Sequence, residues 1–269
     1  MKKFYLSAIT EKGETHVENQ DNYLILYNDK SIDMNDNVLN KKFILGKNDY
    51  LLLCVLDGVS STHNSSLATA LVKDKLIENV HVITNGTDEE LHLLFEGINK
   101  VILNEFDEAA TTISVILLTE NNFLSFNLGD SPSYILNENN FPMLKISETH
   151  TVADYKFKNH ETIEYDALYN MLEFYLGNEF DDNKLYIKRG IYDNHSFITS
   201  TDGLFKTKDI KETLINIIEK EDYLSTKLFN RTIDRDDDIT FIIAKNESVT
   251  IKDKIKYLYN KLTKKEVIY

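Results

Sequence analysis

Apolar residues recur along this chain in short unbroken runs separated by polar turns. The clearest run is Leu51–Leu56 (LLLCVL), which stops at Asp57-Gly58. A short uninterrupted apolar run with a β-branched member is typical of a strand buried on both faces, and Asp-Gly after it indicates a turn. The sequence therefore predicts a rigid core strand with a carboxylate at its end.

The same pattern predicts further strands on both sides of this run. They are expected at Phe4–Thr10, Tyr23–Tyr27, Thr111–Thr119, Phe123–Leu128, Ser133–Leu136, Pro142–Ile146, Leu185–Lys188, Ser196–Ser200 and Ile239–Ala244. Short polar links, such as residues 120–122, indicate hairpins between neighbours. The polar stretch Asn28–Asp49 is expected to be a surface loop or hairpin with little core content.

Helical periodicity begins after Asn64 and returns several times. Thr87 followed by three acidic residues is a plausible N-cap for a helix that runs to about Phe106. In the preceding helix the predicted apolar face consists of Leu67, Ala70, Leu71, Leu76, Ile77 and Val80. Shorter helical patterns follow at Ala167–Leu176, Asp209–Lys220 and Thr250–Lys264, the last of them amphipathic.

No repeat or low-complexity linker divides the chain. The 2 prolines and 9 glycines are scattered, so we expect a single domain over residues 1–246, with a C-terminal helix in residues 247–269 packed on it. Residues 149–183 are the least periodic part and are interpreted as a flap-like surface excursion. Hairpin-connected strands with paired helices favour the α+β class, with a two-layer β core and helices outside.

Charge and cysteine content narrow the choice of partner and compartment. With 30 basic and 44 acidic residues, the net charge is −14, which argues against nucleic acid or an anionic membrane as the main partner. The single cysteine, Cys54, falls inside an apolar run and is expected to be a small core residue in a reducing compartment. Since no signal peptide or membrane span is apparent, a cytoplasmic protein is expected.

Five aspartates stand at the ends of predicted strands. Asp57, Asp130 and Asp202 each follow an apolar run beside a glycine, whereas Asp21 and Asp237 each precede one. Two carboxylates ~5 Å apart repel by about 3 kcal/mol at an effective dielectric of ~20, so a cluster of them needs cations. Oxygen ligands favour Mg²⁺ or Mn²⁺. From the pattern alone, five unrelated turn aspartates are an equally good interpretation.

The order and the amino-acid sequences of these segments resemble those of the protein phosphatase 2C family of metal-dependent serine/threonine phosphatases. The matching segments are NQD at Asn19–Asp21, LDGVSS at Leu56–Ser61, ATT at Ala110–Thr112, LGDS at Leu128–Ser131, STDGL at Ser200–Leu204 and DDIT at Asp237–Thr240. Each string is weak by itself, but six in the same order cover most of the chain. The resemblance implies a four-layer αββα sandwich, in which two antiparallel sheets are flanked by helix pairs, with metals at one edge between the sheets.

The resemblance also implies which residues hold two Mn²⁺ or Mg²⁺ ions. It assigns the bridging carboxylate to Asp57 and a backbone carbonyl ligand to Gly58, with Asp202 and Asp237 as further direct ligands. By the same resemblance, Asp21 binds through metal-held water, and Asp130 matches the position of a third, looser metal in some members. Asp238, at a position often filled by Asn, supports the site through water. A hydroxide held between the ions would attack phosphorus directly, without a phosphoenzyme.

The chain departs from the family pattern at several positions. Where the family often has an arginine that grips the substrate phosphate, this chain has His16, for which we favour a phosphate contact over a plain surface role. Val59 stands where some members place a histidine that protonates the leaving alcohol. His150 matches a family histidine but is interpreted as a structural or supporting residue. His63 is a weak candidate for leaving-group protonation, and a solvated histidine is the preferred interpretation.

Two functions remain open at this point. The first is a phosphatase acting on phosphoserine or phosphothreonine in a phosphoprotein substrate. The second is a catalytically weak phosphoprotein-binding or regulatory module that keeps the fold, which the replacements at His16 and Val59 favour. A further hypothesis is that the flap and the lysine-rich C-terminal helix bind a cognate kinase or regulator.

Overall fold

Strand β5 (Leu51–Leu56) runs through the middle of the molecule with all six side chains buried, as its apolar run predicts. The structure is a computed structural model, and it describes residues 1–34, 37–136, 143–163, 165–179, 184–206 and 236–263. Leu51, Leu53 and Val55 face a second sheet, while Leu52, Cys54 and Leu56 face helices. Since successive side chains of a strand point to opposite faces, β5 contributes to two separate cores.

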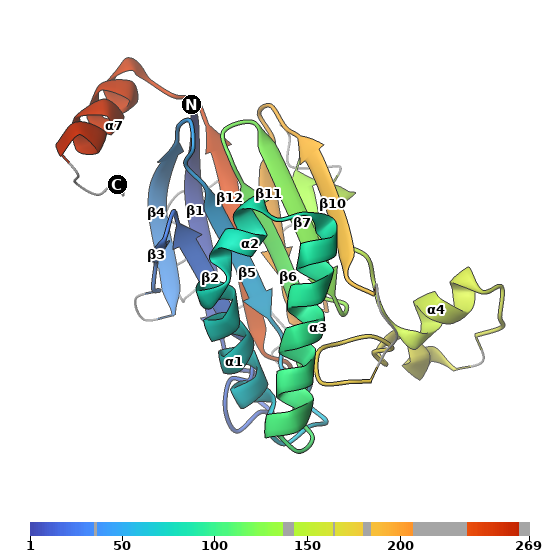
Figure 1. Ribbon diagram of the computed structural model, residues 1–269. Helices are drawn as coiled ribbons and strands as arrows, with labels where there is room; N and C mark the ends of the chain where they lie inside the picture. Colours follow the sequence, from blue (N-terminus) through green and yellow to red (C-terminus); the bar gives the residue numbers. More distant parts are fainter. Residues whose placement is uncertain (35–36, 137–142, 164, 180–183, 207–235, 264–269) are drawn as a thin grey trace.

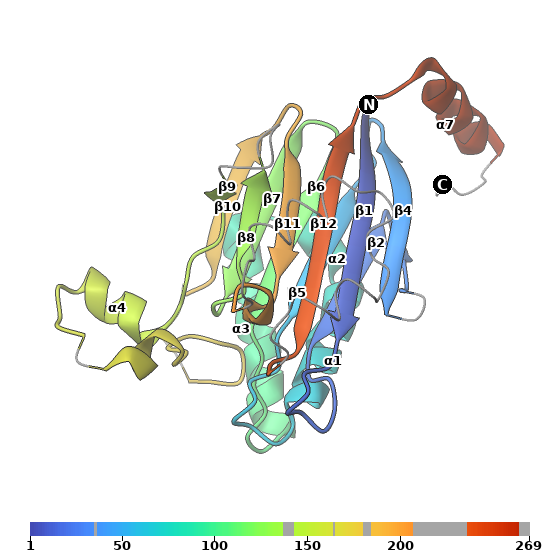
Figure 2. The same ribbon diagram turned by 180° about the vertical axis from the view of Figure 1, so that it is seen from behind.

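Two six-stranded antiparallel sheets lie face to face (Figures 1 and 2). In sheet A the order is β4 (Val38–Leu45), β1 (Lys2–Glu11), β12 (Ile239–Glu247), β11 (Ser196–Ser200), β8 (Ser133–Leu136) and β9 (Met143–Lys145). In sheet B it is β10 (Tyr186–Ile191), β7 (Asn122–Leu128), β6 (Ile113–Leu118), β5, β2 (Asn22–Tyr27) and β3 (Lys30–Ser31). The sandwich of two antiparallel sheets in an α+β chain, expected from the sequence, is confirmed.

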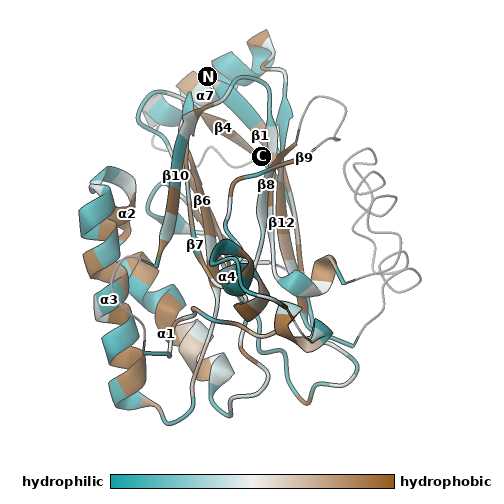
Figure 3. Ribbon diagram, turned by 90° about the vertical axis from the view of Figure 1, so that its right-hand side faces the viewer, coloured by the Kyte–Doolittle hydropathy of each residue, from teal (hydrophilic) through white to brown (hydrophobic). Residues whose placement is uncertain are grey.

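Helices cover the outer face of sheet B (Figure 3). They are α1 (Ser65–Glu78), α2 (Val80–Asn85) and α3 (Asp88–Glu105). The predicted N-cap of α3 is confirmed, because Thr87 accepts from the Glu90 N–H while the Glu90 carboxylate accepts from the Thr87 N–H. The helix predicted at Asp209–Lys220 lies outside the described residues.

The predicted face of α1 is wrong in part, since Leu71 and Val80 do pack partly buried against the core. Of the six residues assigned to it, only Leu76 is buried, while Leu67 and Ile77 are 49% and 39% exposed. The buried residues of the helix are Ser65, Ala68, Thr69, Val72 and Leu76. Apart from Leu76, the side chains of this face are small or β-branched. A pattern that weights only large apolar residues therefore selects the neighbouring stripe of the helix.

Two other predictions about local structure are also wrong. The stretch Asn28–Asp49 contains β4, an edge strand that pairs with β1 and buries Phe43, Ile44 and Leu45 in the core between the sheets. The apolar residues at the end of β4 are few and lie among polar ones, so the sequence pattern did not indicate a core strand. The helix predicted at Ala167–Leu176 is only a 3₁₀ turn, Asp166–Tyr169, since Leu176 instead forms a bridge with Thr111.

Two of the described helices lie at the sides of the sandwich and not on the face of sheet B (Figures 1 and 2). Within residues 149–183, α4 (Val152–Lys158) projects sideways from the two sheets (Figures 1 and 2). The predicted C-terminal helix is observed as α7 (Ile251–Thr263), which stands beside the N-terminus. Among the residues that the structure describes, no helix is both long and apolar enough to cross a membrane.

Candidate metal centre

The five strand-end aspartates gather at one edge of the sandwich. In sheet B, Asp57 follows β5, Asp130 follows β7 and Asp21 precedes β2, while in sheet A Asp202 follows β11 and Asp237 precedes β12. Burial, and then the charges of Asp21, Asp202, Asp130 and Asp237, raise the pKa of the Asp57 carboxyl well above its usual value. The carboxylates therefore act on one another, and Asp57 is at the centre of the group.

The pKa values of three other carboxyls of the group are also raised. Burial and the charge of Asp202 raise the pKa of Asp130 to about 7. The pKa of Asp21 is also raised, first by burial and also by Asp238 and Asp237, although the Thr201 hydroxyl donates to Asp21 Oδ2 at 3.0 Å. Burial raises the pKa of Asp202. A cluster in which charge is disfavoured in this way has the donor chemistry of a site for hard cations.

Lys206 is a cation paired with two carboxylates of this cluster, and no motif in the sequence points to it. Its Nζ lies 2.6 Å from Asp202 Oδ2 and 2.7 Å from Asp237 Oδ2. Burial would lower the pKa of Lys206, but the two carboxylates outweigh this and raise it. The available signal was the position of Lys206 four residues after Asp202, at the 3₁₀ turn Asp202–Leu204 that follows β11.

The backbone around Asp57 is held by the Ala110–Thr112 segment. The Thr112 N–H and the Thr111 hydroxyl both donate to the Asp57 carbonyl, at 2.8 and 3.0 Å. Gly58 lies so close to the Gln20 carbonyl that a Cβ atom there would come within 2.6 Å of it. The site accordingly requires glycine after Asp57, and the ATT segment has a structural role that its sequence alone did not reveal.

Asp238 fixes the loop that carries His16. Its carboxylate, 3% exposed, accepts from the N–H groups of Gly13 and Gln20, each at 2.7 Å. His16 Nδ1 lies 3.0 Å from Asp238 Oδ2 without hydrogen-bond alignment, and its Nε2 lies 3.9 Å from Asp237 Oδ1. The structure thus brings His16 to the carboxylate cluster and gives Asp238 direct backbone contacts. That Asp238 also supports the site through water stays a prediction.

Hydrogen bonds from two other segments hold the loop that carries Asp130. Gly129 has a φ of 111°, a left-handed conformation that favours glycine, and its N–H donates to His150 Nδ1 at 3.0 Å. The next residue but one, Ser131, shares a hydrogen bond of 2.6 Å with the Thr112 hydroxyl. Burial lowers the pKa of His150 to about 4. His150 therefore supports the Asp130 loop as a neutral hydrogen-bond acceptor.

The base of the 149–183 excursion is joined to this site. Thr111 and Leu176 exchange backbone hydrogen bonds of 2.9 and 3.0 Å, and Thr111 is the residue whose hydroxyl reaches Asp57. Gly177, with a φ of 96°, packs against Ala109. Thr111 therefore links the excursion to the Asp57 turn. That the excursion acts as a flap over the site stays a prediction.

The remaining sequence candidates make other contacts. His63 is largely exposed and lies 3.5 Å from Glu108 Oε2. Val59 contributes its backbone, since its carbonyl accepts from the hydroxyls of Thr62 and Ser65. Cys54 is fully buried, and burial raises the pKa of its thiol, as expected for an inert core cysteine.

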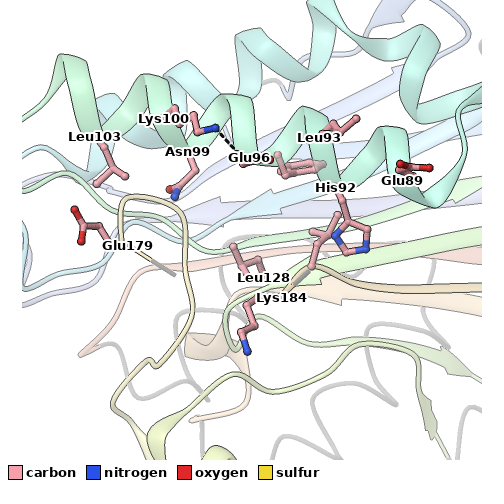
Figure 4. A pocket seen from close by; sticks show the side chains of 12 residues that line it. Glu89, His92, Leu93, Glu96, Asn99, Lys100, Leu103, Leu128, Glu179 and Lys184 are labelled. Atoms are coloured by element: carbon pink, nitrogen blue, oxygen red, sulfur yellow. Dashed lines mark hydrogen bonds and ion pairs between the residues drawn. The ribbon is translucent and has the colours of Figure 1, made fainter. Parts of the chain in front are cut away.

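A separate hollow of about 360 Å³ lies between α3 and the chain around Lys184 (Figure 4). Its floor includes Phe95, Leu128 and Leu185, while Glu96 and Lys100 pair with each other on its rim. None of the site residues predicted from the sequence lines it. The carboxylate cluster is therefore distinct from this hollow.

The carboxylates are gathered but do not converge on one point. Among the described residues, no group of three or more His, Cys, Asp or Glu side chains is arranged to hold a metal ion. The donor set nonetheless fits hard divalent cations, because it consists of carboxylates whose mutual repulsion is offset by one ammonium group. In this arrangement Lys206 stands in for part of the positive charge that the cluster requires.

Comparison with solved structures identifies the fold. A bacterial serine phosphatase matches with a TM-score of 0.70 and 18% identity, over 91% of this chain and 99% of that chain. Serine/threonine phosphatase Stp1 from Staphylococcus aureus matches with a TM-score of 0.66 and 19% identity, over 90% of this chain and 95% of that chain. This chain has the fold of the serine/threonine phosphatases.

A third structure with the same phosphatase fold is the PPM Ser-Thr phosphatase MsPP from Mycobacterium smegmatis in complex with cacodylate. It matches with a TM-score of 0.63 and 18% identity, over 89% of this chain and 97% of that chain. No protein-family model and no curated protein sequence matches the chain. The fold expected from the six short motif segments is thus confirmed by structure, at a level of identity where overall sequence similarity is faint.

Proposed function

We propose that this protein is a metal-dependent phosphatase that hydrolyses phosphoserine and phosphothreonine in proteins. The observation that carries the proposal is the group of five strand-end aspartates, contributed by both sheets, whose charges act on Asp57. The fold shared with serine/threonine phosphatases supports the same activity. The substrate class is a phosphoprotein.

Each aspartate of the cluster has a place in this proposal. Two Mn²⁺ or Mg²⁺ ions, when bound, would supply activation of a water molecule and neutralisation of the phosphoryl oxygens. The residues that would hold them are Asp57, the Gly58 carbonyl, Asp202 and Asp237, with Asp21 acting through water and Asp130 available for a weaker third ion. Hydrogen bonds from Thr111 and Thr112 would keep the Asp57 backbone in position.

The chain's own cationic and hydrogen-bonding groups would bind the substrate phosphate. His16 lies beside Asp237 with its side chain 20% exposed, so one edge of the ring remains accessible to a ligand. Lys206, 47% exposed, carries the positive charge nearest to the same aspartate. Because Val59 brings no acid to the Asp57 turn, the leaving alcohol would take its proton from water.

Phosphate release tests the proposal directly. The chain is assayed with p-nitrophenyl phosphate and with a phosphothreonine peptide, in Mn²⁺ and in chelator, as wild type and as Asp57→Asn. Asp236→Asn is the matched control, since Asp236 is an exposed neighbour of Asp237. We expect Mn²⁺-dependent release that Asp57→Asn lowers by at least about a hundredfold and Asp236→Asn leaves unchanged. Release that persists in chelator or in Asp57→Asn would contradict the proposal.

One observation favours the second candidate, a phosphoprotein-binding module with little turnover. The Lys206 ammonium group pairs with the carboxylates of Asp202 and Asp237, and a metal ion has to displace it before either carboxylate can act as a ligand. Calorimetry with Mn²⁺ and with the phosphothreonine peptide separates the two candidates. Binding of both without phosphate release would identify the binding module, whereas turnover of the peptide would exclude it.

A further inference from the structure

Helix α7 has its polar side against the protein and its apolar side in solvent. The buried positions are Tyr257 and Asn260, at 5% and 7% exposure, and Asp253 is half-buried on the same side. In contrast, Ile251, Ile255 and Leu258 are 78%, 63% and 56% exposed. A helix that completes the core of its own domain has the opposite arrangement, so its apolar side is available to something outside the chain.

Specific polar contacts hold α7 in this orientation. The Tyr257 hydroxyl donates to Asp49 Oδ2 at 2.5 Å, and Lys261 Nζ lies 3.3 Å from Asp49 Oδ1. The Tyr257 side chain fills the space beside Gly46, where a Cβ atom would meet the tyrosine hydroxyl oxygen at 2.2 Å. At the other end of the helix, Lys3 pairs with Asp253 at 3.2 Å. The apolar side therefore cannot turn inward without breaking buried hydrogen bonds.

The exposed apolar residues form one stripe with positive charge beside it. Ile251, Ile255 and Leu258 are spaced by four and three residues, which places them on one face of a helix. Since successive residues are about 100° apart, Lys252 and Lys254 fall on opposite flanks of this stripe. Residues 251–263 contain four lysines and one acidic residue, in a chain whose net charge is −14. The stripe is thus apolar in the middle and cationic at both edges.

We propose that α7 docks this protein on an anionic lipid surface, with Ile251, Ile255 and Leu258 at the headgroup boundary and the flanking lysines among the headgroups. Interfacial helices have this pattern of an apolar face edged by lysines. Pairing with a second copy through the same stripe would bring lysine flanks against lysine flanks. The helix stands at an outer corner of the sandwich, beside the N-terminus (Figures 1 and 2).

Docking through α7 leaves the carboxylate cluster free. Strand β12 starts just after Asp237 and Asp238 and ends at Glu247, before α7. Its nine residues separate the two regions by about 30 Å at the usual rise of a strand. The expectation that no membrane is a partner was drawn from the net charge of the whole chain, whereas the cationic stripe is a local feature. The proposal is independent of the phosphatase activity.

Cosedimentation of the full chain with lipid vesicles tests the proposal. The vesicles are phosphatidylcholine alone, or an equal mixture of phosphatidylcholine and phosphatidylglycerol. The variant Ile255→Asp/Leu258→Asp removes the stripe, and Ile191→Asp is the matched control, because Ile191 is an 82% exposed residue on β10. Circular dichroism and thermal unfolding confirm that each variant is folded, which is expected because all three side chains are exposed.

We expect the wild type to bind the anionic vesicles at least about tenfold more tightly than the neutral ones, and to be released by high salt. Ile255→Asp/Leu258→Asp should lose this binding and Ile191→Asp should keep it. Absence of binding to anionic vesicles would overturn the proposal, as would equal binding by the stripe variant. A dimer in sedimentation velocity that the stripe variant abolishes, without vesicle binding, would overturn it in favour of a second copy.

Discussion

Lys206 Nζ lies 2.7 Å from Asp237 Oδ2 and 2.6 Å from Asp202 Oδ2, so the segment before β12 and the segment after β11 share one ammonium group. An ammonium group compensates part of the negative charge that the cluster concentrates around Asp57. It cannot compensate all of it, since the pKa values of Asp57, Asp130 and Asp202 are all raised. The cluster therefore retains the capacity to bind further cations.

Replacing Lys206 by Met should strengthen Mn²⁺ binding by about tenfold, because a divalent ion then has no internal cation to displace. In chelator the same variant should unfold at a lower temperature than the wild type, since Asp202 and Asp237 lose the ammonium group that pairs with both of them. Calorimetry measures the affinity and thermal unfolding the stability. Lys75→Met is the control, because Lys75 pairs with Glu78 on the surface of α1. Unchanged or weaker Mn²⁺ binding would contradict the prediction.

Asp238→Ala should lower the free energy of unfolding by about 3 kcal/mol, because it leaves the N–H groups of Gly13 and Gln20 without their acceptor. Denaturation in urea measures the effect. Asp236→Ala, on the exposed neighbour, should change stability by less than about 0.5 kcal/mol. An Asp238→Ala variant as stable as Asp236→Ala would show that the His16 loop is not held in this way.

His150 should make the native state sensitive to acid. Its pKa is lowered to about 4 by burial, against 6.5 for an ordinary histidine, despite the nearby Glu148 carboxylate. Between these values the unfolded chain binds the proton and the native chain does not. The contribution is therefore present above about pH 6.5 and is lost as the pH falls toward about 4, by up to about 3 kcal/mol.

His150→Asn is the variant that tests this titration. Its side-chain oxygen can still accept from the Gly129 N–H, while the titrating group is removed. Urea unfolding across this pH range should give a shallower loss of stability for the variant than for the wild type. Parallel curves for the two proteins would contradict the prediction.

Two glycines should respond in opposite ways to alanine. A Cβ at Gly97, exposed on α3, would meet no atom within 4 Å, so Gly97→Ala should stabilise the protein by about 1 kcal/mol. A Cβ at Gly177, where φ is 96°, would lie 2.0 Å from the Ala109 carbonyl oxygen. Gly177→Ala should destabilise the protein and loosen the base of the excursion. Thermal unfolding of both variants is the measurement, and a destabilised Gly97→Ala would contradict the helix assignment.

Local pattern was sufficient for most strands but failed where burial depends on a distant neighbour. The unbroken run at Leu51–Leu56 predicts its strand because both faces are apolar. Residues 38–45 carry only a short apolar end, and they become a core strand because β1 pairs with them and buries Phe43. The burial of Ala68 and Thr69 on α1 likewise follows from the sheet beneath the helix.

For the site, the sequence by itself determined that five aspartates stand at strand ends, because strand ends and turns are local features. Only the tertiary structure decided that these aspartates gather, since the packing of the two sheets brings together residues as far apart in the sequence as Asp21 and Asp237. It also decided that Lys206 lies between two of them. For α7 the sequence determined an amphipathic helix, but the polar contacts of Tyr257 with Asp49 decided that the apolar side faces outward.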